Sequence, residues 1–357
     1  MSTILIAPDS FKGSATSIEV AAAIAQGWRT VRPDDEVIEI PFADGGEGTV
    51  LAIEYAQPTA IRIYCPEISP DAYWLLLDDA TAVVELAQVS GLTLLDTLDP
   101  LGAHTYAFGQ LLANATKDSR VERIYCALGG SASTDGGVGA LMALGTIFLD
   151  ELGNSIGLGG AELARISSID SSNSVAPPKG GVFLLVDVQS ALLGVNGASS
   201  VFAPQKGASS GEVQVLESAL QRFANCVGHP DSPGSGAAGG TAYGLSSLWG
   251  AHIESGAAKM AELCGLNSYI HGADLIITGE GRLDSQSFQG KVVGHITQFA
   301  QLAEVPIAYC VGSIEGAFPK PSLGGISLAE LASSAKESIE NPHKYLFEAG
   351  VQLARFI

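Results

Sequence analysis

Positive charge is scarce in this chain, which has 18 lysines and arginines among 357 residues, against 38 aspartates and glutamates. The formal net charge is −20, and the few basic residues form no cluster. Proteins that bind nucleic acids or anionic membranes gather lysine and arginine on one face. We therefore expect no nucleic-acid partner and no membrane partner. A site for an anion would have to collect its cations locally.

Cysteine is also scarce: the five residues lie far apart, with no CxxC pair. This pattern indicates free thiols in a reducing compartment, not a disulfide framework or a zinc site. No apolar run approaches the roughly 18 residues that a membrane span needs. The first residues lack the basic and apolar regions of a signal peptide. We expect a cytoplasmic protein.

Several common catalytic motifs are missing as well. The Walker sequence GxxxxGK[ST], the zinc motif HExxH and the nucleophile motif GxSxG do not occur. One GxGxxG match, residues 234–239, follows the polar stretch 229–233 and not a strand. The match is therefore weak evidence for a dinucleotide site, and a flexible loop before an apolar helix explains it better.

What the chain does have is a regular alternation of short apolar runs and helical patterns. The 46% apolar content excludes intrinsic disorder, and the length suggests two domains. Buried strands alternating with helices indicate an α/β fold with largely parallel sheets. The apolar runs that we interpret as strands are residues 4–7, 37–40, 123–128, 182–188, 275–278 and 307–311.

Two predicted hairpins interrupt this alternation. One pairs residues 73–77 with 81–86, and the other lies within 147–156. Hairpins do not belong in a plain doubly wound sheet, so we place both in a second domain with a mixed sheet. We predict an outer Rossmann- or flavodoxin-like parallel-sheet domain from residues 1–62 and 272–357. A mixed α/β domain of residues 63–271 interrupts it.

Five polar loops follow predicted strands, at the sheet edge where α/β folds bind ligands. The loop 129–139 is the most informative, because its five glycines exceed what a turn requires. Its backbone N–H groups and hydroxyls suit a phosphate chain, and Asp135 could hold Mg²⁺. The loop 43–49 offers a similar glycine-rich cradle. Asp187 ends an apolar run, where an unpaired carboxylate is costly.

These strings together resemble the bacterial glycerate kinase family, the type that includes glycerate 2-kinase. The matching segments are residues 7–14, 43–49, 129–132, 135–137, 197–199, 202–208, 236–240 and 278–286. The resemblance implies ATP-dependent phosphorylation of D-glycerate with Mg²⁺, with the 2-hydroxyl favoured over the 3-hydroxyl. It also implies two α/β domains with the active site in the cleft between them. It leaves a homodimer open.

The resemblance and the loop chemistry lead to specific assignments. We expect catalytic roles for Asp187, Lys12 and Arg282, with Asp187 accepting the proton of the reacting hydroxyl. We expect Asp135 and Asp284 to bind Mg²⁺. The residues expected to bind glycerate or ATP are Asp9, Ser10, Asp44, Gly45, Gly46, Glu47, Gly129, Gly130, Ser131, Gly136, Gly137, Lys206, Gly239, Gly240, Glu280 and Lys291.

Two other functions stay open at this point. A dehydrogenase of a small hydroxy acid would use glycines 234–239 to bind a dinucleotide. A sensor would bind an organic acid without chemistry. The density of cations and carboxylates across five loops favours the kinase.

Overall fold

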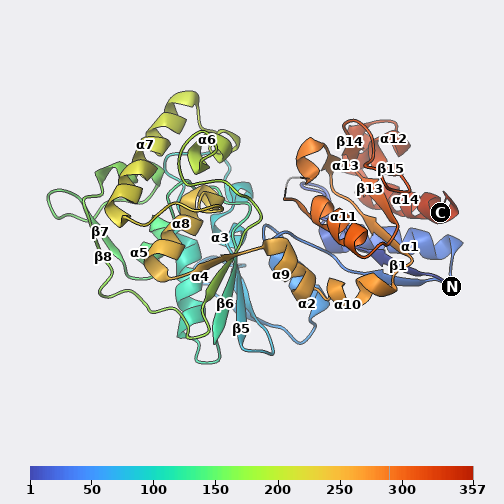
Figure 1. Ribbon diagram of the computed structural model, residues 1–357, viewed down its shortest axis with the longest axis horizontal. Coiled ribbons are helices and arrows are strands. Elements are labelled where there is room, and N and C mark those ends of the chain that lie inside the picture. Colours follow the sequence, from blue (N-terminus) through green and yellow to red (C-terminus); the bar gives the residue numbers. More distant parts are fainter. Residues whose placement is uncertain (289, 357) are drawn as a thin grey trace. The chain divides into compact units, whose positions relative to one another are not determined.

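The computed structural model describes residues 1–288 and 290–356, which form two compact units (Figure 1). Unit 1 comprises Met1–Asp44, Leu51–Pro58 and the chain from Ala257 onward. Unit 2 comprises Gly45–Val50 and Thr59–Gly256. The chain therefore leaves unit 1 twice, first for six residues and then for the long middle segment. Both units mix helices with a central sheet, which confirms the predicted α/β class.

Unit 1 is built on a five-stranded sheet in the order β15-β13-β11-β1-β2, and every neighbouring pair is parallel. β1 (Thr3–Ile6), β11 (Leu275–Thr278) and β13 (Ile307–Val311) are apolar and almost wholly buried. Strands covered on both faces read as continuous apolar runs, which is why the sequence reveals them. The edge strands are β2 (Glu36–Glu39) and β15 (Gly325–Ser327).

Helices α1 (Ser17–Val31) and α14 (Pro342–Phe356) pack against each other on one face of this sheet. α1 begins with a capping box, in which Thr16 accepts from the Glu19 N–H and Glu19 accepts from the Thr16 N–H. The two helices approach closely at Gly27 and Gly350. A Cβ at Gly27 would lie 2.1 Å from the Phe347 carbonyl oxygen, so larger residues are excluded there.

Unit 2 is built on a six-stranded sheet in the order β10-β9-β6-β5-β4-β3. The first four strands in that order are parallel, whereas β4 and β3 are antiparallel to their neighbours. The strands are β3 (Ile61–Tyr64), β4 (Tyr73–Leu76), β5 (Thr81–Glu85), β6 (Arg123–Ala127), β9 (Val182–Leu185) and β10 (His252–Glu254). The middle of the chain therefore carries the expected mixed sheet.

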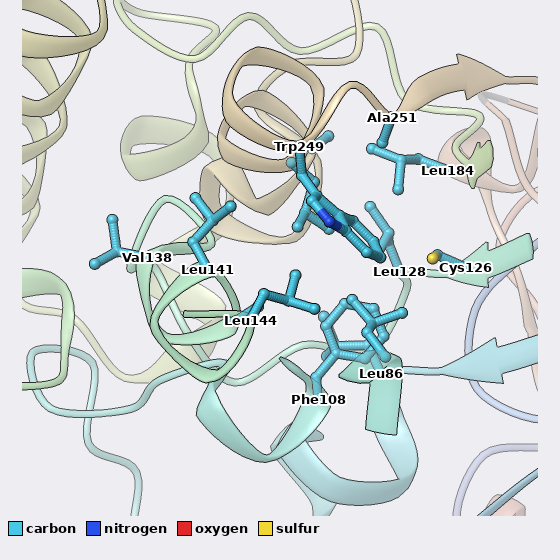
Figure 2. Packing of buried hydrophobic residues seen from close by; sticks show 14 of the residues in the cluster. Leu86, Phe108, Cys126, Leu128, Val138, Leu141, Leu144, Leu184, Trp249 and Ala251 are labelled. Atoms are coloured by element: carbon cyan, nitrogen blue, oxygen red, sulfur yellow. The ribbon is translucent and has the colours of Figure 1, made fainter. Parts of the chain in front are cut away.

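A single large apolar cluster packs this sheet against its helices. Figure 2 shows part of it, with Trp249 next to Leu128, and Phe108 close to Leu86. Phe108 lies on α4 (Tyr106–Lys117), and Trp249 is the last residue of α8 (Ala237–Trp249). The Trp249 indole N–H donates to the Val175 carbonyl at 2.7 Å, so its one polar atom is satisfied in the core.

The two predicted hairpins have different outcomes. β4 and β5 pair antiparallel, as expected. The prediction for residues 147–156 is confirmed in part, because Leu149 forms an antiparallel bridge with Ser155 and the Ile156 N–H donates to the Phe148 carbonyl at 3.0 Å. The strand β7 (Ile147–Leu149) also pairs with β8 (Ser168–Asp170), a partner that the sequence did not predict. The turn after β7 closes through Asp150, whose carboxylate accepts from the N–H groups of Leu152 and Asn154. This turn brings residues 155 and 156 back to β7, and β8 adds a second partner from later in the chain.

The remaining elements connect these layers. In or between the segments of unit 1 they are α2 (Thr49–Ala56), α9 (Gly256–Leu263), α10 (Leu266–Tyr269), η4 (Ile270–Gly272), β12 (Arg282–Leu283), η5 (Ser285–Phe288), α11 (Val292–Leu302), β14 (Ser313–Ile314), α12 (Leu328–Leu331) and α13 (Ala335–Glu340). In unit 2 they are α3 (Ala87–Ser90), η1 (Leu92–Leu94), α5 (Val138–Ala143), η2 (Gly160–Arg165), α6 (Ala198–Phe202), η3 (Pro204–Lys206) and α7 (Ser210–Val227). All five cysteines are free thiols. Among the helices of the described chain, none combines the length and apolar character that a membrane span requires.

Candidate functional site

In unit 1, charged residues gather where the chain order of the strands reverses. β1 lies between β2 and β11 in the sheet. The next strand in the chain, β2, lies on one side of β1, and the later strands β11, β13 and β15 lie on the other side. The carboxyl ends of strands at such a point form the usual ligand crevice of α/β sheets. Asp9 follows β1, and Glu280 follows β11. The Asp9 N–H donates to the Gly279 carbonyl at 2.9 Å, which joins the two loops.

Asp9 has an unusual environment for a carboxylate. Desolvation by its surroundings and, to a smaller extent, the negative charge of Asp44 raise the pKa of Asp9 to about 7. The Ser10 N–H, which donates to Asp9 Oδ1 at 2.7 Å, and the positive charge of Lys12 oppose that rise. Asp9 therefore interacts with three other predicted site residues, Ser10, Lys12 and Asp44.

Glu280 lies in the same neighbourhood and is 7% exposed. Burial raises the pKa of Glu280, while Ser287 and Lys291 lower it. Lys291 Nζ lies 3.8 Å from Glu280 Oε2. Glu280 Oε1 is buried and accepts no hydrogen bond within the described residues. A buried carboxylate oxygen without a donor is suited to a cation or a ligand hydroxyl.

The other charged residues of this loop are more exposed. The side chain of Arg282 is 67% exposed and pairs with Glu315 at 2.7 Å and with Asp284 at 3.9 Å. The charge of Asp284 also raises the pKa of Glu280, so these two carboxylates are neighbours. In the described parts of the chain, histidine, cysteine and acidic side chains form no group of three or more that could hold a metal ion.

In unit 2, two glycine-rich loops pack together at the carboxyl ends of the parallel strands. The Gly129 N–H donates to the Gly45 carbonyl at 3.2 Å. A Cβ at Gly129 would lie 2.5 Å from Gly46 Cα, and one at Gly45 would lie 2.8 Å from Leu185 Cβ, at the end of β9. The glycines here allow close approach of two backbones, which any larger side chain would prevent. Glu47 is exposed beside Gly130.

Lys206 is buried next to this pair of loops and is 3% exposed. Its Nζ donates to Ser131 Oγ at 2.9 Å and to the Ser133 carbonyl. Burial lowers the pKa of Lys206 to about 7, opposed by the negative charge of Asp135. Lys206 forms no ion pair with a carboxylate among the described residues. Lys206 and Ser131, both predicted to bind glycerate or ATP, are therefore in direct contact.

Asp135, which the sequence predicts to bind Mg²⁺, is held by four hydrogen-bond donors. Its Oδ2 accepts hydrogen bonds from the Thr105 N–H at 2.8 Å, the Thr105 hydroxyl at 2.8 Å and the Gly139 N–H at 3.2 Å. Its Oδ1 accepts from the Gly137 N–H at 3.1 Å, and the residue is 1% exposed. With four donors and no access to solvent, Asp135 organises the loop and the start of α5. These contacts favour a structural role over Mg²⁺ binding.

Four of the predicted binding glycines pack closely against other parts of unit 2. A Cβ at Gly137 would lie 3.0 Å from the Thr241 Cα and carbonyl oxygen, and one at Gly136 would lie 2.9 Å from the Phe223 ring. Gly239 and Gly240 have φ values of +66° and +85°, and a Cβ at Gly239 would lie 2.1 Å from the Ser133 carbonyl oxygen. These glycines let the first turn of α8 pack against the loop 133–137. The GxGxxG match at residues 234–239 ends at Gly239, and the element that precedes it in the chain is helix α7, not a strand.

Asp187 lies two residues beyond β9, and Asp187 Oδ1 accepts a hydrogen bond from the Ser255 hydroxyl at 2.9 Å. It is half-buried at the strand end that the sequence predicts for it. Its role as proton acceptor stays a prediction.

Glu85, which the sequence analysis did not single out, belongs to the same edge of unit 2. It is the last residue of β5 and is 3% exposed. Its two carboxylate oxygens accept from the Gly48 and Val50 N–H groups, both at 3.0 Å. An apolar strand that ends in a carboxylate is the same signal that identifies Asp187, and it could have identified Glu85.

Comparisons with known proteins agree across nearly the whole chain. The model of the Glycerate kinase family matches residues 4–357. A glycerate kinase of Halalkalibacterium halodurans is 37% identical, covering 99% of this chain and 98% of that protein. The glycerate 2-kinase of Escherichia coli K12 is 39% identical over 87% of this chain and 85% of its own. A solved structure from Salmonella typhimurium LT2, assigned as glycerate kinase 2, has a TM-score of 0.76 at 31% identity, covering 99% of this chain and 98% of that chain.

Proposed function

The chain belongs to the glycerate kinase family, and from this membership and its loops we propose that it transfers the γ-phosphoryl group of ATP to D-glycerate. It is a phosphotransferase, and the family implies ATP as the donor. Phosphoryl transfer needs little covalent help from the protein, because catalysis comes from positioning and charge stabilisation. The observation that carries the proposal is the buried Lys206, next to two converging glycine-rich loops in unit 2. The dinucleotide and sensor alternatives have no comparable support.

We assign the phosphate groups of ATP to the unit 2 loops. Gly129, Gly130 and Ser131 follow β6, and Lys206 Nζ donates to the Ser131 hydroxyl. A buried lysine without a carboxylate partner among the described residues is a cation whose charge an arriving phosphate can balance. Gly45, Gly46 and Glu47 pack beside these residues. In a protein of net charge −20, such a local cation supplies the attraction that the overall charge does not.

We assign Mg²⁺ to Glu280 and Asp284 in unit 1. The unpartnered Oε1 of Glu280 and the neighbouring charge of Asp284 fit a hard cation that prefers oxygen ligands. Two carboxylates suffice, because Mg²⁺ usually takes its other ligands from phosphate and water. When bound, Mg²⁺ would neutralise phosphate charge during transfer. Lys12, Lys291 and Arg282 would supply further positive charge.

The reacting hydroxyl of glycerate needs a proton acceptor. Asp187 is our proposal for that role, and Asp9 is the alternative, because its pKa of about 7 suits a general base near neutral pH. We propose the 2-hydroxyl as the site of phosphorylation, in line with the name of the Escherichia coli relative. We further propose that the enzyme acts in the cytoplasm.

The test is a coupled assay of ADP release with D-glycerate, Mg²⁺ and ATP, followed by phosphorus NMR of the product. We expect ADP release that depends on both D-glycerate and Mg²⁺, and a product spectrum of 2-phosphoglycerate. Reactions that lack D-glycerate measure background ATP hydrolysis. Folded protein that releases no ADP above that background would refute the proposal, and a 3-phosphoglycerate spectrum would refute the regiochemistry alone.

A further inference from the structure

Glu85 is a buried carboxylate that holds the backbone of a distant loop through two hydrogen bonds. It ends β5, where it pairs with Ala127 in the parallel ladder. Its oxygens accept from the N–H groups of Gly48 and Val50, on either side of Thr49, the first residue of α2. The first N–H groups of a helix have no partner within the helix. Glu85 supplies a partner from a distant strand for the Val50 N–H in the first turn and for the Gly48 N–H just before the helix, a task that a local capping side chain often performs.

The segment that Glu85 holds is residues 45–50, which belongs to unit 2 although the chain on both sides of it belongs to unit 1. This segment crosses the ends of three strands. Val50 and Gly48 meet the end of β5 through Glu85, Gly46 packs on Gly129 after β6, and Gly45 packs on Leu185 at the end of β9. Its Glu47 lies beside Gly130, with a Cβ built at Gly130 3.6 Å from Glu47 Cβ.

A charge at this place costs the fold free energy. Burial raises the pKa of Glu85 to about 7 even though the N–H groups of Val50 and Gly48 oppose that shift, and the charge of Glu47 adds to the rise. The desolvation of the carboxylate therefore outweighs the two hydrogen bonds. A neutral side chain would fold at lower cost, but it could not accept from both N–H groups with full strength. What the carboxylate contributes is a fixed position for segment 45–50.

We propose that Glu85 is a positioning residue, which fixes segment 45–50 over the strand ends so that Gly45, Gly46 and Glu47 stay aligned beside Gly130. The proposal rests on the proposed function, in which these residues bind ATP. Glu85 acts through the backbone of the segment and does not itself touch the substrate.

The experiment uses the full chain and three variants. Glu85→Gln keeps the size of the side chain and places an NH₂ group against one of the two N–H groups. Glu85→Asp keeps the charge but is one methylene too short to reach both. Glu212→Gln is the matched control, because Glu212 in the same unit accepts from the Ser209 N–H at 2.8 Å in the capping box of α7. It makes the same chemical change, a carboxylate to an amide, at a helix cap away from the strand ends.

We measure amide hydrogen exchange of the peptide that spans 45–50, the kcat and KM for ATP, and the melting temperature at pH 8. For Glu85→Gln and Glu85→Asp we expect exchange in this peptide to rise at least about tenfold and kcat/KM for ATP to fall at least about tenfold. For Glu85→Gln the melting temperature should not fall, because a buried charge is removed. Glu212→Gln should alter exchange at the start of α7 alone, with unchanged kinetics.

Unchanged exchange over 45–50 in both Glu85 variants would overturn the proposal, as would faster exchange with wild-type kcat/KM. A lower melting temperature with unchanged kinetics would show a role in folding only. If wild-type protein releases no ADP with D-glycerate, the proposed function fails. The exchange measurement still decides whether Glu85 positions the segment. If Glu85→Gln does not fold, Glu85→Asp carries the same comparison.

Discussion

Replacing Lys206 with methionine should make the stability of the free protein less dependent on pH while it removes activity. Methionine retains most of the apolar stem of lysine and fills the same buried space. It removes the ammonium group, together with its hydrogen bonds to the Ser131 hydroxyl and the Ser133 carbonyl. The two effects on the free energy of unfolding have opposite signs, so their sizes decide the outcome.

The pKa shift gives the first effect. The pKa of Lys206 falls from 10.5 to about 7 on burial, so between these values the unfolded chain binds more protons than the folded protein. Stability from this group is therefore lowest at acidic and neutral pH and rises as the pH rises. At pH 7 the penalty is about 4 kcal/mol, and about 2 kcal/mol of it is recovered by pH 9.

The lost hydrogen bonds give the second effect, about 1–2 kcal/mol each. At pH 7 these terms nearly cancel, so Lys206→Met should be about as stable as wild type. The stability of wild type relative to the variant should then rise by about 2 kcal/mol between pH 7 and pH 9. The kcat/KM for ATP should fall at least about a hundredfold, since the cation assigned to the phosphates is gone.

The assay is urea unfolding at pH 7 and pH 9, followed by tryptophan fluorescence in a Trp28→Phe background. Trp28 lies in unit 1, whereas the other two tryptophans, Trp74 and Trp249, lie in unit 2 with Lys206. The fluorescence then reports unit 2 alone. Lys117→Met, at the exposed end of α4, controls for the removal of one positive charge. Parallel stability curves for wild type and Lys206→Met would refute the argument, because they would mean that burial does not perturb this lysine.

Three further predictions concern single residues. Gly137→Ala should lower stability by about 1–3 kcal/mol, measured by urea unfolding, because its Cβ meets the Thr241 backbone at φ +74°; Gly153→Ala, with a similar φ in open space, separates strain from clash. Asp187→Asn should lower kcat by ~10²–10⁴ with the Mg²⁺ requirement unchanged, and a loss below about tenfold would exclude Asp187 as the base. Glu280→Gln should raise the Mg²⁺ concentration for half-maximal activity at least about tenfold, and an unchanged titration would remove Glu280 from the metal site.

The sheets were largely predictable because their central strands are buried. β1, β11 and β13 have no solvent-facing side, so each is a continuous apolar run that stands out from its surroundings. β8 and β10 have only three residues each and no such run. Their position depends on partners elsewhere in the chain, which local sequence patterns do not contain.

The roles of individual residues were harder to predict than their places. A glycine in a loop can serve a positive φ, a close backbone approach or a ligand, and the sequence does not separate these. Gly129 and Gly137 belong to one glycine-rich loop, yet Gly129 packs on Gly46 and Gly137 packs on Thr241. Asp135 has the sequence context of a metal ligand, whereas two of its four donors come from Thr105, 30 residues earlier, which the local sequence does not indicate.

Glu85 and Lys206 show how an acidic protein can prepare a site for an anion. Burial raises the pKa of the carboxyl group to about 7 and lowers that of the ammonium group to about 7, so each group is about half ionised at neutral pH. The charge of each group therefore changes readily with its surroundings near neutral pH. A bound phosphate favours the protonated form of Lys206, so part of its binding free energy goes to charging that lysine. The site therefore gains positive charge when the anion binds. An exposed cluster of arginines would instead be charged at all times, whatever the net charge of −20 on the chain.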